Sequence, residues 1–193
     1  MSNEILKINL LDKVINFFKK KIKLIIILLI ALILILFIFL FYKNLQDKKN
    51  ILIAEQYAHA SILIKQKKIQ ESKILLEIII REDHPLYSPL ALYLIIDNKI
   101  ENNDLKIINF FDQILKNNSI QEENLNLIKI KKAIYLFNFD REELIIETLN
   151  PIINSNSAWR DISINLITEY FLSKNQKVKA DEYIQLLNKN NNK

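Results

Sequence analysis

The stretch LIIILLIALILILFIFLFY, residues 24–42, decides the architecture of this chain. It has no charged residue, no Pro and no Gly, and its one hydroxyl is that of Tyr42 at its end. As a helix it would extend for roughly 28 Å, close to the ~30 Å hydrocarbon core of a bilayer. A core helix of a soluble protein is usually shorter or has a polar face. The stretch therefore predicts a transmembrane helix, which follows a short basic tail, residues 1–23, and precedes one domain, residues 43–193.

The lysines around this span predict its orientation. Lys19, Lys20, Lys21 and Lys23 crowd its start, whereas the far side begins with Lys43, and Lys48 and Lys49 follow at lower density. Because basic residues near a span tend to stay in the cytoplasm, we expect the N-terminus inside and the domain outside. A cleaved signal peptide is the alternative, but its apolar region is shorter, about 7–15 residues, and ends at small residues. Since this run is longer and ends in Leu-Phe-Tyr, we expect an uncleaved, single-pass anchor.

The charge of the chain is concentrated before the span. Residues 1–23 hold six Lys and two acidic residues, whereas residues 43–193 hold 21 basic and 20 acidic side chains. The net charge of +5 is therefore mostly a topology signal, and we expect no nucleic-acid partner. The chain has no Cys, which excludes disulfides and thiolate metal sites. It also has no Gly, while Ile, Lys and Asn are frequent, a bias typical of an AT-rich genome.

Helical spacing of apolar residues extends over the rest of the chain. Residues 2–18 form either an amphipathic helix on the inner leaflet or a helical extension of the anchor. After the span no segment shows the alternation of a strand. We expect eight helices there, at about 46–65, 69–81, 89–96, 104–115, 121–137, 141–149, 158–172 and 178–187.

Several boundaries of these helices have specific signals. Ser88 followed by Pro89 predicts a helix start with Ser88 as its N-cap. Asp104 and Asp140 are expected to cap the helices that follow them. The Asn150-Pro151 pair is expected to end a helix at Leu149, because the residue before Pro is disfavoured in a helix.

The turns within successive helix pairs fall at Lys67, Asn98, Asn138 and Asn175, roughly 31 to 40 residues apart. Asn best replaces Gly in the left-handed conformation after a helix, so we expect these Asn residues to adopt it. Short helices in pairs with such a period are typical of a helix–turn–helix solenoid.

Four segments carry a resemblance to a known family. KIQESKILLEIII, residues 68–80, and NQKVKADEYIQLL, residues 175–187, look like second helices of tetratricopeptide (TPR) repeats, with Ala180 at the small-residue position where two helices touch. HPLYSPLALYLIIDN, residues 84–98, and SAWRDISINLITEYFLSKNQ, residues 157–176, resemble repeat segments of the ancillary SecYEG translocon subunit family, single-span proteins of the inner membrane.

The resemblance implies an all-α fold, with the N-terminal transmembrane helix followed by a TPR-like α-solenoid of about four helical hairpins in the periplasm. It implies as partners the Sec translocon, periplasmic chaperones and exported proteins. The function it implies is a membrane-anchored interaction module that helps exported proteins or their chaperones on the periplasmic side. Two alternatives stay open, a tethered scaffold for envelope or outer-membrane protein assembly and a domain that only self-associates.

The sequence contains no catalytic, cofactor-binding or metal-binding pattern. The two histidines, His59 and His84, have no metal-ligand spacing, and His84 is expected to serve as a turn or cap residue. The acidic pairs at 122–123 and 142–143 are expected at helix starts, where carboxylates suit the helix dipole. We therefore expect no enzyme, no cofactor and no small-molecule substrate.

One site of partner contact is suggested by residue type. Trp159 and Arg160 open the segment that resembles a terminal repeat, and Trp and Arg are common anchors at protein interfaces. The alternative for Trp159 is that it packs in the core.

Overall fold

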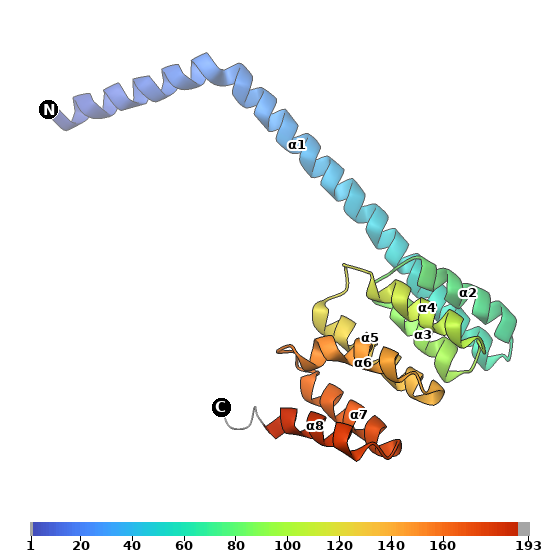
Figure 1. Cartoon of the computed structure of the whole chain (residues 1–193). Coiled ribbons are helices and arrows are strands. Elements are labelled where there is room, and N and C mark those ends of the chain that lie inside the picture. The colour runs from blue at the N-terminus through green and yellow to red at the C-terminus, as the bar shows by residue number, and fades with distance from the viewer. Residues whose placement is uncertain (1, 189–193) are drawn as a thin grey trace. The chain divides into compact units, whose positions relative to one another are not determined.

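The computed structural model describes the backbone of residues 2–188 and the side chains of residues 21–24 and 26–187. This part of the chain is all-helical and contains no strand, which confirms the predicted class (Figure 1). The chain divides into two compact units, Met1–Leu52 and Ile53–Lys193. The elements are α1 (Ser2–Lys65), α2 (Ile69–Arg81), α3 (Tyr87–Asp97), α4 (Asp104–Leu115), α5 (Glu122–Leu136), the 3-10 turn η1 (Phe137–Phe139), α6 (Glu142–Ile153), α7 (Arg160–Ser173) and α8 (Lys177–Asn188).

The first unit consists of helix α1 up to Leu52. No Pro or Gly occurs in α1, so the sequence offers nothing to end the helix after the apolar run. The predicted start of a separate helix at Gln46 is therefore wrong, since α1 is continuous there. Residues 2–18 are also helical, but the prediction of an amphipathic face concerns side chains outside the described residues.

In the part of the chain that the structure describes, α1 is the one helix long and apolar enough to cross a membrane. The large apolar side chains described in this run are all exposed, from Ile26 at 49% to Phe37 at 73%. Length and composition thus make α1 a candidate membrane span.

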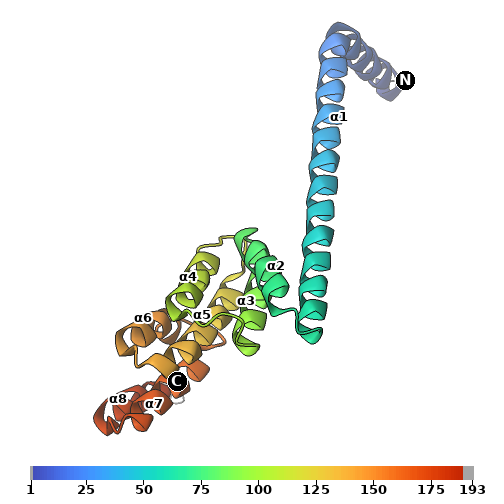
Figure 2. The same cartoon turned by 90° about the vertical axis from the view of Figure 1, so that its right-hand side faces the viewer.

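The second unit is a succession of helices. From α2 to α8, each helix packs against the next one in the chain (Figure 2). Two hydrophobic clusters fill the spaces between them. The first joins the end of α1 with α2, α3 and α4, and the second joins α5 to α8. Helix α5 takes part in both, because Ile128 lies in the first cluster and Ile130 in the second.

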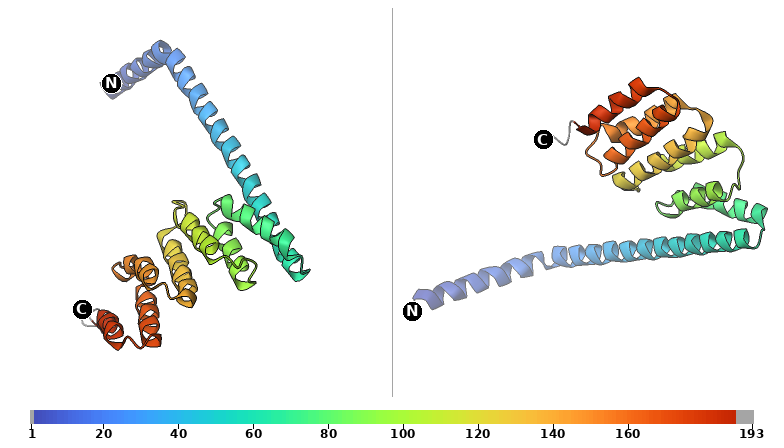
Figure 3. Two further views of the ribbon diagram at one scale, coloured as in Figure 1. Left: turned by 45° about the vertical axis from the view of Figure 1, so that its right-hand side comes forward. Right: turned by 90° about the horizontal axis from the view of Figure 1, so that it is seen from below.

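Polar contacts between successive helix pairs join residues separated by similar distances along the chain. The carboxyl groups of Asp104, Glu123 and Glu142 accept hydrogen bonds from Tyr135, Ser157 and Lys179, which lie 31, 34 and 37 residues later. The succession of pairs is visible from two further directions in Figure 3. Ala180 is fully buried in the second cluster, as expected for a small residue at a helix contact.

The start of α3 differs from the prediction. The helix begins at Tyr87, so that Ser88 is inside its first turn and is not its N-cap. The Ser88 hydroxyl donates to the carbonyl of Ile79 at 2.8 Å and accepts the backbone N–H of His84. His84 supplies the cap instead, because its Nδ1 accepts the N–H groups of Leu86 and Tyr87, each at 3.1 Å. The predicted turn or cap role of His84 is confirmed.

Two other predicted caps are wrong. Helix α4 is capped by Asn103, whose Oδ1 accepts the N–H of Lys106 at 3.2 Å, and Asp104 is its first residue. Before α6, Asp140 has a left-handed backbone with φ of 51°, and no side chain caps the helix.

The predicted end of α6 at Leu149 is also wrong, because the helix continues through Pro151 to Ile153. Pro in a helix interior costs about 3 kcal/mol. Ile152 and Ile153 are buried in the second cluster. Burying each of these two side chains contributes about 1.5–3 kcal/mol, which is enough to keep the last turn helical.

Left-handed residues end several helices, although the chain has no Gly. Of the expected Asn residues only Asn175 is left-handed, with φ of 58°. Lys67 is also left-handed, whereas Asn98 has φ of −96° and the next residue, Lys99, adopts the left-handed conformation. The prediction of left-handed Asn98 and Asn138 is therefore wrong, because the geometry of the helix end fixes the position, whichever residue occupies it.

Candidate interaction site between α3 and α5

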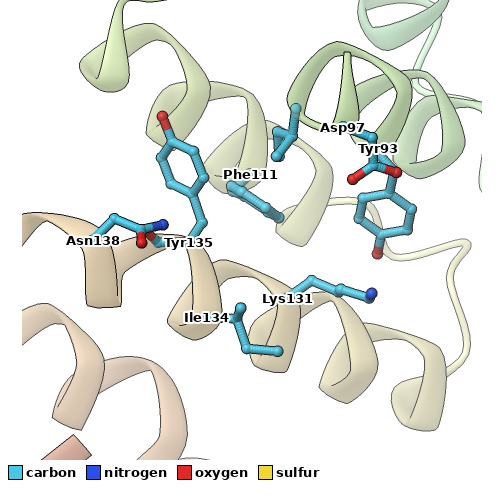
Figure 4. A pocket seen from close by; sticks show the side chains of 8 residues that line it. Tyr93, Asp97, Phe111, Lys131, Ile134, Tyr135 and Asn138 are labelled. Atoms are coloured by element: carbon cyan, nitrogen blue, oxygen red, sulfur yellow. The ribbon is translucent and has the colours of Figure 1, made fainter. Parts of the chain in front are cut away.

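The first helices of successive pairs, α3, α5 and α7, line a series of hollows. The one between α3 and α5, called here the tyrosine pocket, has a volume of about 230 Å³ (Figure 4). It is lined by Tyr93, Ile96, Asp97, Phe111, Lys131, Ile134, Tyr135 and Asn138. Small-molecule sites usually enclose ~300–1,000 Å³, so this pocket has the size for one or two side chains of a partner.

Aromatic rings form the floor and the walls of the tyrosine pocket. Phe111 of α4 is fully buried beneath it, and Tyr93 of α3 and Tyr135 of α5 stand on either side (Figure 4). The Tyr135 hydroxyl donates to Oδ1 of Asp104 at 2.8 Å, which holds the ring in place. Burial raises the pKa of Tyr93 to about 12, and burial together with Asp104 raises the pKa of Tyr135. Both phenols are therefore neutral, so that the charges that line the pocket are those of Asp97 and Lys131.

Three polar side chains lie at the rim of the pocket, Asp97, Lys131 and Asn138. The Nζ of Lys131 lies 5.8 Å from the ring centroid of Tyr93, in cation–π contact. Among the described side chains, no opposite charge lies within 4.0 Å of either Asp97 or Lys131. The rim thus offers one charge of each sign and an amide.

A second hollow continues from the tyrosine pocket along α3 and α5. It shares Tyr93, has a volume of about 160 Å³, and is lined only by uncharged residues, namely Pro85, Leu86, Pro89, Leu90, Tyr93, Asn124, Leu127 and Ile128. This hollow is called here the leucine pocket. Together the two pockets form a groove, the α3–α5 groove, whose inner surface is mainly apolar and whose ends carry the amides of Asn124 and Asn138.

A third hollow lies between α5 and α7, with a volume of about 270 Å³. Ile134 of α5 lines both this hollow and the tyrosine pocket, and its side chain is 45% exposed. Ile162 of α7 lines the third hollow but not the tyrosine pocket, and its side chain is 47% exposed. A change at Ile134 therefore affects both hollows, whereas a change at Ile162 affects only the third one.

The predicted contact residues, Trp159 and Arg160, lie away from the α3–α5 groove, at the start of α7. Trp159 is half-buried and packs against the second hydrophobic cluster. The guanidinium of Arg160 donates from Nε to the carbonyl of Ile153 at 2.9 Å and from Nη2 to that of Leu186 at 3.2 Å. These two carbonyls belong to the last turns of α6 and α8, so Arg160 joins the C-terminal ends of two helices.

The acidic pairs stand at helix starts, as predicted, and their side chains make contacts within the fold. Helix α5 begins at Glu122 and α6 at Glu142. The carboxylate of Glu123 accepts from the Ser157 hydroxyl, and that of Glu142 accepts from Lys179 at 2.6 Å. Among the residues with described side chains, no group of three His, Cys, Asp or Glu gathers that would hold a metal ion.

A cluster of four charges ties α2 to α4. Glu101 contacts Lys73 at 3.0 Å and Lys106 at 3.2 Å, and Lys106 also contacts Glu77 at 2.6 Å. Hydrogen bonds from the backbone of Asn103 and from these two lysines lower the pKa of Glu101 to about 2. Alternating signs leave the cluster nearly neutral, which fits a structural contact between helix pairs.

Sequence reasoning missed the α3–α5 groove. Tyr93 and Tyr135 continue the apolar periodicity of their helices, and only the packing of α3, α4 and α5 brings them to opposite walls of one pocket. A signal was available in α5 and the turn η1 after it, where the exposed Lys131, Ile134 and Asn138 recur at intervals of three and four residues.

Comparison of the chain with protein-family models, with curated proteins and with solved structures finds no match.

Proposed function

We propose that this chain is a membrane-anchored protein-interaction module, with α1 as the anchor and the α3–α5 groove as its binding surface. The observation that carries the proposal is the groove itself. A contiguous row of apolar side chains that face solvent on a small domain marks an interaction surface. Pockets of this size accept side chains of a protein partner and are small for a metabolite.

The proposal includes a TPR-like arrangement of about four hairpins. Support comes from hydrogen bonds that join residues 31 to 37 positions apart and from the position of the hollows between first helices of successive pairs. In such a solenoid each pair contacts mainly its neighbours, and the first helices share one extended surface.

Within this class we propose an ancillary subunit of the Sec translocon, with the domain in the periplasm, acting on exported proteins or their chaperones. Support comes from the resemblance of residues 84–98 and 157–176 and from the lysines before the span. Tethering raises the effective concentration of the domain for segments that emerge nearby. Weak binding then suffices, and weak binding permits release.

Site-specific crosslinking in native membranes tests this function. A photoreactive residue replaces Ile134, at the groove, in the full chain, and a matched chain carries it at Leu105, which is 63% exposed on α4. Capture of a Sec component from position 134, and not from 105, supports the proposal. Capture of outer-membrane assembly factors replaces it with the scaffold function, and capture of only the chain itself replaces it with self-association.

The orientation is tested separately. Alkaline phosphatase fused after Lys193 should be active in a Gram-negative host, because the enzyme folds only outside the cytoplasm. An inactive fusion contradicts the orientation, and a mature N-terminus near Asn44 contradicts the uncleaved anchor.

A further inference from the structure

We propose that the α3–α5 groove binds an extended, net-neutral polypeptide segment of about six residues, with two bulky apolar side chains three residues apart. The larger side chain enters the tyrosine pocket and the smaller one enters the leucine pocket. This inference rests on the proposed function and names the ligand of the same surface.

The spacing follows from the helices that line the groove. Leu127 lines the leucine pocket and Ile134 lines the tyrosine pocket, and they are two turns apart on α5. At about 1.5 Å per residue this separation is roughly 10 Å. An extended chain in the polyproline conformation advances about 3.1 Å per residue and returns to the same face every third residue. Two side chains three residues apart therefore reach the two pockets.

The amides at the ends of the groove favour an extended ligand over a helical one. Asn124 of α5 and Asn138 of the following turn η1 are about 21 Å apart along the helix axis, the length of roughly six extended residues. Asn138 donates to the carbonyl of Tyr135, which leaves its side-chain oxygen as an acceptor. An extended segment has backbone N–H and C=O groups free to meet such amides, whereas a helix has satisfied most of its own.

The charges at the rim favour a segment without net charge. Asp97 and Lys131 have opposite signs and stand at the same pocket, and the leucine pocket has no charged lining residue. An acidic or a basic segment would gain from one rim charge and be repelled by the other. An unfolded stretch of an exported protein has the required chemistry, apolar side chains on a free backbone.

Calorimetric titration of the full chain in nanodiscs tests the proposal, with empty nanodiscs as the blank. The probe is the unlabelled, N-acetylated and C-amidated peptide Ser-Leu-Asn-Ser-Phe-Ser. Replacing its Leu and Phe by Ser should weaken binding about tenfold or more, because two apolar side chains lose their burial. A peptide with Leu and Phe adjacent should bind at least fivefold more weakly than the probe. Equal binding of the three peptides overturns the proposal, and so does tighter binding of a helical peptide with the two residues seven apart.

Two matched isoleucines locate the binding site on the protein. Ile134→Asp should weaken binding of the probe tenfold, whereas Ile162→Asp should leave it within twofold, since only Ile134 lines the tyrosine pocket. Equal weakening by both variants assigns binding to the hollow between α5 and α7 and overturns the proposal. If a variant fails to fold, the three peptides still decide on the unchanged protein.

The outcome is separable from that of the proposed function. Crosslinks to a Sec component without peptide binding would overturn only the proposal about the ligand of the groove. Peptide binding without any crosslinked partner from position 134 would retain the ligand and refute the translocon role.

Discussion

Replacement of Arg160 by Ala should destabilise the domain by about 2–4 kcal/mol. Its side chain is only 16% exposed, and its guanidinium donates to the carbonyls of Ile153 and Leu186. Hydrogen bonds from a charged donor contribute about 1.5–3 kcal/mol each, and partial hydration of the freed carbonyls reduces the sum. The positive charge also lies at the C-terminal ends of two helices, where it is favourable.

The expected order of variants is specific to this geometry. Arg160→Lys should lose about half as much stability as Arg160→Ala. A guanidinium is a planar fork that donates to both carbonyls at once, whereas a single ammonium reaches only one of them. Arg160→Glu should lose most, since it places a carboxylate beside two negative helix ends. Arg141→Ala is the matched control, because Arg141 is exposed and should change stability by less than about 0.5 kcal/mol.

Thermal unfolding followed by circular dichroism, on the full chain in micelles, measures these differences. At about 3 °C per kcal/mol for a domain of this size, Arg160→Ala should lower the Tm by roughly 6–12 °C. A Tm within about 2 °C of the parent, or equal to that of Arg141→Ala, would refute the argument. Loss of a crosslinked partner at unchanged Tm would assign Arg160 to an interface, as the sequence suggested.

Three further predictions concern stability. The pKa of Glu101 lies near 2 in the folded chain and near 4.5 in the unfolded one, so its contribution to stability is full above about pH 4.5 and is lost as the pH falls towards 2. The free energy of unfolding in urea should therefore fall by about 1–2 kcal/mol between pH 6 and pH 3, and Glu101→Gln should remove this fall. An equal fall in the parent and in the variant would contradict the argument. Lys99→Gly should raise the free energy of unfolding by about 1 kcal/mol because φ is 51° there, whereas Asn98→Gly, at φ of −96°, should lower it; the same sign for both would refute the reasoning. His84→Ala should cost about 1 kcal/mol through loss of the cap on α3, with the exposed His59→Ala as the control, and equal Tm values would exclude a capping role.

The sequence predicts helices well wherever apolar periodicity and flanking polar residues agree. The bounds of 69–81 and 104–115 are confirmed residue for residue for this reason. Prediction fails where tertiary packing outweighs a local signal. Pro151 should end α6, but burial of the two following isoleucines keeps the turn helical.

The candidate site was less accessible to sequence reasoning. Trp159 and Arg160 stand out by residue type, yet the contacts of Arg160 lie within the fold. Its guanidinium donates to one carbonyl seven residues earlier in the chain and to another 26 residues later. The tyrosine pocket depends on Tyr93 and Tyr135, which lie on two helices of different pairs. Periodicity identifies such residues as apolar-face members, and only the packing of helix pairs shows which of them leave a space between them.

The left-handed residues lower the thermal stability of the domain, because none of them is Gly. Five described residues, none of them Gly, have φ between 51° and 62°. The conformation costs about 1–2 kcal/mol at each of Lys67 and Lys99 and less at Asp83, Asp140 and Asn175, because Asp and Asn adopt it more readily. Because the chain has no Gly, these helix ends lack the one residue that adopts a left-handed backbone without steric cost. Introducing Gly at Lys67 and Lys99 should therefore give a more heat-stable domain, whereas Asp140→Gly would also remove the ion pair of Asp140 with Lys174.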